Sequence, residues 1–329
     1  MWVQPAAVRA AIWDLYSAAP PASTHFNRKK LMMCTAESIF EAKGSAALVV
    51  QGGGMRGTYS AAALAAMEDA GLNGRFSDIY ATSSGALNGA YFIAHQANEG
   101  VSIYVDELSK KSFIDMRRVR RIIDIDFLVD DVLTYRVPLD VGAVEASDIL
   151  LHIGLTSAST GRLVWATNKS QWPLLESLRA TAALPIFYGR EVSLGNDSYV
   201  DGGVSVKLPL RAAVENNHEN IVVILTRPLS YETTDVNRCI GIATRHAAKL
   251  QGHSPAVVRA LASIDPSFAQ SLELLNSPSA SSGTPGRPRI WVVAPSAPIA
   301  GRLTRDRDLL KRTAALGRED AQRALGLTQ

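Results

Sequence analysis

The chain has 329 residues, of which 47% are hydrophobic and 20% are charged, and its formal net charge is +3. This length accommodates one large α/β domain or two small ones, and the composition is that of a globular protein. A charge so close to neutrality, without a basic stripe interleaved with aromatic residues, argues against a nucleic-acid-binding protein.

Residues 1–45 predict an N-terminal helical extension. Residues 6–18 have the spacing of a short amphipathic helix, which either packs on the domain or anchors it peripherally to a membrane. The N-terminus lacks the features of a secretory signal, and no stretch reaches the roughly 20 apolar residues that span a bilayer. Two isolated cysteines, Cys34 and Cys239, fit a reducing compartment. We therefore expect a cytoplasmic protein.

The next segments alternate between strand and helix patterns. Residues 46–50 (AALVV) form a continuous apolar run typical of a strand that is buried on both faces. A helix is predicted over 59–70, a second strand over 79–81 and a second helix over 85–96. This alternation predicts a three-layer α/β/α fold with a mainly parallel central sheet.

Residues 99–140 are more polar and predict a helical insertion. It carries apolar residues such as Phe113 and Leu128 together with a basic cluster. The cluster is interpreted either as a solvated face or as a patch that attracts anionic lipid headgroups. Its members are Lys110, Lys111, Arg117, Arg118, Arg120 and Arg121.

The second half of the chain continues the sheet. Residues 151–157 and 162–167 predict a strand pair, residues 172–183 a helix, and Tyr199-Val200 a strand that leads to Asp201. We find no repeat and no clear linker, so residues 46–329 are expected to form one domain. The remaining expected elements are strands at 220–226 and 290–294, a Ser/Pro/Gly-rich loop at 277–288 and a charged helix from residue 304.

A glycine-rich loop follows the first predicted strand. Its G-x-G-x-x-G spacing also occurs in dinucleotide-binding folds, but these place an acidic residue at the end of the second strand, which here ends in Ala81-Thr82-Ser83. Successive backbone N–H groups at a helix N-terminus can instead stabilise an oxyanion. We therefore expect an oxyanion hole formed by Gly52, Gly53, Gly54, Met55, Arg56 and Gly57.

A second short motif, Ala81-Thr82-Ser83-Ser84-Gly85, lies where the second strand meets its helix. It has the form of a nucleophile elbow, in which small residues flank a serine at a sharp strand-to-helix turn. Counting back from Gly85 identifies Ser83 as the nucleophile, with Ser84 as the residue that follows it. Ala81 and Gly85 support the elbow, although Ala81 stands where the pattern has glycine.

With these motifs the chain resembles the patatin-like phospholipases, a family of lipid acyl hydrolases. The glycine loop, the serine elbow and the later Asp201-Gly202-Gly203 follow the family's order. Ala86-Leu87-Asn88 and the stretch from Arg179 to Pro185 add further matches. The resemblance covers residues 46–226 well and does not extend to residues 1–45.

The resemblance implies a patatin-like fold and a Ser–Asp dyad, in which Ser83 attacks an ester carbonyl and Asp201 is its base, with Gly202 and Gly203 beside it. It implies a lipid ester substrate, and together with the apolar and basic residues of the insertion it suggests peripheral contact with an anionic membrane. The sequence has no calcium-loop pattern, so we expect no metal or cofactor. The oligomeric state stays open. Two alternatives also remain: a lipid-binding member with weak catalysis, and a Ser–His–Asp esterase that uses His218, His246 or His253.

Overall fold

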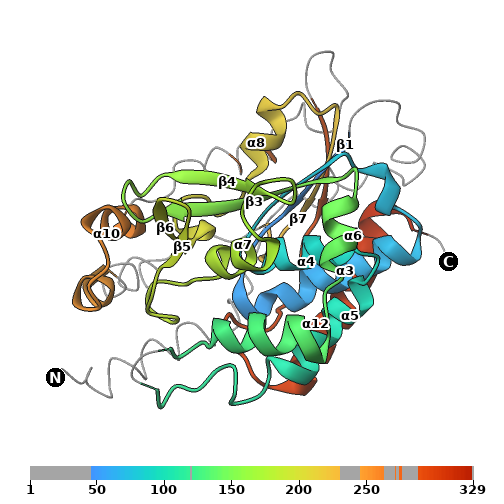
Figure 1. Ribbon diagram of the computed structural model, residues 1–329. Helices are drawn as coiled ribbons and strands as arrows, with labels where there is room; N and C mark the ends of the chain where they lie inside the picture. The colour runs from blue at the N-terminus through green and yellow to red at the C-terminus, as the bar shows by residue number, and fades with distance from the viewer. Residues whose placement is uncertain are drawn as a thin grey trace.

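In the computed structural model, the described residues are 46–118, 121–229, 245–262, 271, 274–275 and 288–327. They form an α/β structure around one central sheet (Figure 1). The predicted extension at 1–45, both cysteines, Arg120 and most of the loop predicted at 277–288 lie outside these residues.

The central sheet has eight strands in the order β5-β6-β3-β2-β1-β7-β8, with β4 paired to β3. The pairs β1–β2, β1–β7, β2–β3 and β7–β8 are parallel, whereas β3–β4, β3–β6 and β5–β6 are antiparallel. The predicted, mainly parallel sheet is therefore confirmed. The strands are β1 (Ala46–Val50), β2 (Asp78–Thr82), β3 (Leu150–Ser157), β4 (Leu163–Thr167), β5 (Val192–Leu194), β6 (Asp197–Asp201), β7 (Asn220–Ile224) and β8 (Arg289–Val293).

Alternate residues of a strand point to opposite faces of the sheet, and both faces of this sheet carry apolar residues. Helices cover both faces. Leu48 and Val50 of β1 belong to the larger core cluster, whereas Ala47 and Val49 belong to a second cluster on the other face. Figure 1 shows α3 (Gly57–Asp69), α4 (Ser84–Ile93), α5 (Ala97–Ser102) and α12 (Arg307–Leu325) gathered on one side of the sheet, with α8 (Leu210–Glu215) on the other.

Helix α3 is buried along most of its length, and it packs against α12, α5 and α4. Its run of alanines permits this packing, since small side chains let neighbouring elements approach closely. Gly317 of α12 marks the closest approach, because a Cβ at this position would lie 2.4 Å from the carbonyl oxygen of Tyr59. The C-terminal helix is thus a fixed part of the layer that carries the glycine loop.

The segment predicted as a helical insertion, residues 99–140, is called the cap. It includes the end of α5 and two π-helical segments, η4 (Ile103–Glu107) and η5 (Phe127–Arg136), and α6 (Val141–Ala146) follows it. π-Helices are rare and occur frequently at functional sites. Among the described helices, none combines the length and apolar content needed to cross a bilayer.

Among the described strands and α-helices, four escaped the sequence analysis: the three-residue strand β5, the helices α6 and α8, and the helix α10 (Pro255–Ala262), which lies beyond β5 and β6 in Figure 1. Strand β5 is too short to show a period, and its antiparallel pairing with β6 comes from the chain turning at Gly195. The predicted helix over 172–183 is shorter in the structure, where α7 spans Leu174–Thr181.

Candidate active site

Ser83 lies at a strained turn between β2 and α4. Its φ of 54° and ψ of −135° are rare for a residue with a side chain. Helix α4 starts directly after it, and Gly85 permits the crossing, since a Cβ there would lie 2.5 Å from the carbonyl oxygen of Val50. Ala81 is fully buried in β2, so the methyl group that departs from the elbow pattern is accommodated in the core. The turn holds Ser83 at the positive end of the α4 dipole.

Asp201 ends β6 and is 1% exposed. Its Oδ1 accepts the backbone N–H of Gly203 at 2.6 Å, whereas Oδ2 is buried without a hydrogen-bond donor of normal geometry among the described residues. Burial raises the pKa of Asp201 to about 6, and the Ser83 hydroxyl, the Gly203 N–H and the charge of Arg302 act in the opposite direction. Asp201 is therefore a buried, half-satisfied carboxyl group beside Ser83.

Gly202, the residue after Asp201, allows the end of β6 to approach β3 closely. A Cβ on Gly202 would lie 2.0 Å from the carbonyl oxygen of Gly154 in β3 and 3.0 Å from Cγ2 of Thr82. Any larger residue would push β6 away from β2 and β3. The Asp-Gly-Gly sequence thus brings the carboxyl group close to the serine turn.

Hydrogen bonds to partners outside the glycine loop, residues 51–57, help to fix its shape. The N–H of Gly53 donates to Oγ of Ser84 at 2.9 Å. The N–H of Met55 donates to the carbonyl oxygen of Arg302, in the segment before α12, at 3.0 Å. Both N–H groups are therefore committed to partners within the protein.

The N–H of Gln51 donates to the carbonyl oxygen of Ile224 in β7, and the remaining loop amides divide into two groups. The N–H groups of Arg56 and Gly57 form hydrogen bonds within the loop itself. Those of Gly52 and Gly54 form no hydrogen bond within the described part of the chain. Gly52 packs against Ser83, since a Cβ on it would lie 2.9 Å from the Ser83 Cβ. Gly54 has a φ of 59°, which favours glycine. It borders the same pocket as Ser83.

A buried polar network connects the glycine loop to the cap. Tyr104 of η4 donates to Oδ1 of Asn88 at 2.9 Å, and Nδ2 of Asn88 donates to the carbonyl oxygen of Gly57 at 2.9 Å. Burial raises the pKa of Tyr104, and hydrogen bonding to Asn88 and Ser84 opposes this rise. The network joins the serine elbow, the glycine loop and the cap into one unit.

An apolar pocket begins at Ser83 and runs beneath the cap. Its cavity occupies about 520 Å³, part of it open to solvent. No described residue of its wall carries a charge. Its wall comprises Gly54, Met55, Ser83, Ser84, Leu87, Tyr104, Leu108, Phe113, Ile123, Ile125, Leu128, Val129, Leu133, Leu178, Ala182 and Leu184.

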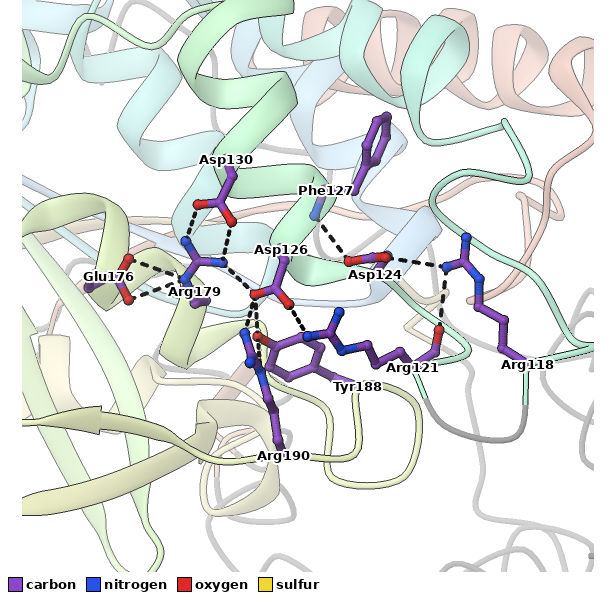
Figure 2. A network of polar contacts seen from close by, with 10 residues as sticks. All are labelled: Arg118, Arg121, Asp124, Asp126, Phe127, Asp130, Glu176, Arg179, Tyr188 and Arg190. Carbon is purple, nitrogen blue, oxygen red and sulfur yellow. Dashed lines mark hydrogen bonds and ion pairs between the residues drawn. The ribbon is translucent and has the colours of Figure 1, made fainter. Parts of the chain in front are cut away.

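A charged network ties the cap to α7, as Figure 2 shows. Nη1 of Arg179 contacts Oδ1 of Asp126 at 2.6 Å, and the guanidinium also pairs with Asp130 in the cap and Glu176 on its own helix. The same Oδ1 accepts the Tyr188 hydroxyl at 2.6 Å. Arg190 and Arg121 also pair with Asp126. The network therefore lies beside the pocket wall formed by η5 and α7.

The basic cluster of the cap is largely paired in the structure. Arg117 pairs with Asp115 of the cap, and its side chain is 77% exposed. Four members form ion pairs with cap carboxylates: Lys110 with Glu107, Arg117 with Asp115, Arg118 with Asp124, and Arg121 with Asp126. The cap thus carries less free positive charge than its sequence suggests.

None of the three histidines considered for a triad lines the described pocket at Ser83. Nε2 of His218 is 3.2 Å from the Tyr80 hydroxyl and 3.6 Å from Asp78, at the opposite end of β2. Nε2 of His253 contacts the carbonyl oxygen of Pro185 at 2.6 Å, and His246 is exposed. No described residue of the pocket wall is a histidine. Among the described residues, no cluster of His, Cys, Asp or Glu has the arrangement of a metal site.

The structure thus brings the elbow and the glycine loop together at one pocket, and the Asp-Gly-Gly turn packs against the end of β2 that leads into the elbow. Sequence analysis missed two contributors. The hydroxyl of Thr181 accepts the Ser83 N–H at 2.8 Å, and the Arg302 carbonyl holds the glycine loop. Thr181 falls within the 179–185 match and could have been noticed there, whereas Arg302 belongs to no motif.

The chain is similar to known proteins in sequence and in structure. The sequence profile of the patatin-like phospholipase family matches residues 48–214, just over half of the chain. The uncharacterized protein YjjU of Escherichia coli (strain K12) is 30% identical over 195 residues, a match that covers 56% of this chain and 53% of YjjU. The chain spans about half the length of this curated relative. The crystal structure of VipD from Legionella pneumophila aligns with a TM-score of 0.42 at 8% identity, covering 87% of this chain and 67% of VipD.

Proposed function

Because this chain belongs to the patatin-like phospholipase family, we propose that it is a serine acyl hydrolase that cleaves lipid carboxylic esters through Ser83 and Asp201. The observation that carries the proposal is a strained serine turn beside a buried carboxyl group at the end of an apolar pocket. An exposed carboxylate has a pKa near 4 and is a weak base for a hydroxyl proton. A raised pKa makes Asp201 a better one.

In the proposed mechanism, Oγ of Ser83 attacks the ester carbonyl carbon while Asp201 accepts the hydroxyl proton. The tetrahedral intermediate collapses to an acyl-enzyme, and the leaving alcohol takes up the proton from Asp201. Water then attacks the acyl-enzyme with Asp201 again as base, which releases the fatty acid and regenerates the Ser83 hydroxyl. Two protons pass in turn through the Asp201 carboxyl group, one in each half of the cycle, and Asp201 returns the second to Oγ of Ser83, so the cycle balances.

The negative charge of each intermediate requires nearby donors. We propose that the N–H of Gly54 serves this role, since it forms no hydrogen bond among the described residues and its residue borders the pocket with Ser83. The N–H of Gly52 is the second candidate within the loop. Gly53, Met55, Arg56 and Gly57 then shape the loop, because their N–H groups already donate elsewhere.

The pocket wall supports an acyl chain as the bound group. It consists mainly of aliphatic side chains from the cap, α4 and α7, and burying each methylene group of a chain contributes about 0.8 kcal/mol. No charged residue of the described wall could hold a phosphate inside it. The headgroup of the substrate would therefore remain outside the pocket.

Covalent labelling tests the proposal directly. A fluorophosphonate probe should modify the protein, with the label mapped by mass spectrometry to the peptide that contains Ser83, and the protein should release fatty acid from phospholipid or lysophospholipid micelles. A label on a different residue would contradict the assignment. Lipid binding without labelling or release would favour the alternative of a weakly catalytic, lipid-binding member.

Peripheral contact with an anionic membrane is a further part of the proposal, and salt dependence measures its electrostatic component. A free basic residue near such a surface contributes about 1 kcal/mol, but most of the described cluster is paired. We expect hydrolysis of anionic vesicles to fall only about threefold between low and high salt. Fatty-acid release at a fixed vesicle concentration would be measured.

Charge reversal provides the matched comparison. Arg117→Glu changes an exposed ion pair on the cap, and Arg211→Glu changes an exposed ion pair on α8, on the other face of the sheet. Both variants should retain activity close to that of the wild type on vesicles. A steep loss in Arg117→Glu alone, together with strong salt dependence, would show that the cap attracts anionic headgroups through this face.

A further inference from the structure

The three residues that end α7 and follow it contact both members of the Ser–Asp pair. The Ser83 N–H donates to Oγ1 of Thr181 at 2.8 Å. The Asp201 N–H donates to the carbonyl oxygen of Ala183 at 3.0 Å. The nucleophile and the carboxyl residue are therefore both attached, through their backbones, to one short segment.

The serine turn needs such an attachment. A residue in a sparsely populated backbone conformation costs about 1–3 kcal/mol and persists only where its surroundings impose it. The carbonyl oxygen of Ser83 is held by the N–H of Ala86 in the first turn of α4. Its N–H is held by the Thr181 hydroxyl, which is fully buried. This hydroxyl thus fixes one side of the strained peptide.

The same hydroxyl extends to the strand next to Asp201. Oγ1 of Thr181 donates to the carbonyl oxygen of Gly154 in β3 at 2.7 Å. That oxygen is the atom against which Gly202 packs. One hydroxyl group therefore lies between the backbone of the serine turn and the backbone contact that seats Asp201.

The other end of the segment is anchored by charge. Two residues before Thr181, Arg179 is 7% exposed and pairs with Asp126 and Asp130 of the cap (Figure 2). These pairs restrict movement of α7 along or around its axis, so the Thr181 hydroxyl has a defined position relative to the sheet.

We propose that Thr181 is a positioning residue for the Ser83–Asp201 pair, whose hydroxyl holds the strained serine turn in register with the strand that carries the aspartate. The inference rests on the proposed function. Thr181 does not line the described pocket, so it acts through Ser83 and not on the substrate.

Two substitutions separate the hydroxyl from the packing. Thr181→Val keeps the shape but removes the hydroxyl, and kcat should fall about 10- to 100-fold, the cost expected of a misplaced reacting group. KM should stay within about threefold of the wild type, because the acyl pocket is unchanged. Thr181→Ser restores the hydroxyl and should recover most of kcat. Ser254→Ala is the control, since that hydroxyl also joins a backbone N–H, of Val257, to a carbonyl, of Ala158, away from Ser83.

The pH profile distinguishes positioning from general destabilisation. The Ser83 hydroxyl lowers the pKa of Asp201, so a displaced Ser83 should move the acid limb of kcat/KM to higher pH in Thr181→Val. A folded Thr181→Val variant with wild-type kcat and acid limb would overturn the inference, as would equal losses in Thr181→Ser. If the valine variant does not fold, Thr181→Ala carries the same comparison. Absence of Ser83-dependent hydrolysis in the wild type would instead refute the proposed function.

Discussion

Replacing Ser83 with alanine should abolish lipid-ester hydrolysis and fluorophosphonate labelling together. Ser83 lies at the strained turn between β2 and α4 and borders the apolar pocket. Loss of a catalytic serine typically reduces kcat by roughly 10⁴-fold or more, which leaves only background hydrolysis. Fatty-acid release and intact-protein mass spectrometry after probe treatment would measure the two effects.

Ser84→Ala is the matched control for this result. Its hydroxyl accepts the Gly53 N–H at 2.9 Å and so shapes the glycine loop. One neutral hydrogen bond contributes about 1 kcal/mol, so we expect roughly a fivefold loss of kcat with labelling retained at Ser83. If Ser84→Ala loses labelling and Ser83→Ala keeps it, the nucleophile has been assigned one residue too early.

Replacing Asp201 with asparagine should lower kcat about 10²- to 10⁴-fold, the usual contribution of a general base. The amide keeps the shape of the side chain and the acceptor for the Gly203 N–H, but it cannot take the Ser83 proton. Gln variants of His218, His246 and His253 should retain activity. A folded histidine variant without activity would favour a Ser–His–Asp triad.

The pH dependence of the wild type tests the same residue. Asp201 must be ionised to act as a base, and its pKa is raised to about 6, so kcat/KM should rise with pH through about 6 and then level off. The Asp201→Asn variant should lack this rise of kcat/KM with pH. Ionising a buried carboxyl with a raised pKa costs folding free energy as pH increases from about 4 to 6. Asp201→Asn should therefore unfold no earlier than the wild type at pH 8, which excludes misfolding as the cause of inactivity.

The local turns of this protein could be predicted from the sequence. At the glycine loop and at the serine elbow, a buried strand is followed by small residues and then by a helix pattern. The shape of such a turn depends mainly on residues that are adjacent in the sequence. The close contacts of Gly85 and Gly202 show why small residues are required there. The parallel sheet also followed from the sequence, because alternating strand and helix patterns leave few other arrangements.

Only the tertiary structure decided how these turns interact. The Gly53 and Met55 N–H groups, expected to face an oxyanion, are committed to Ser84 and Arg302. The pKa of Asp201 is raised by burial, which depends on every element packed around it. The basic cluster is offset by carboxylates of the same cap. Hydrogen bonding, burial and charge pairing depend on which distant residues meet in space, and residue patterns along the chain do not specify those meetings.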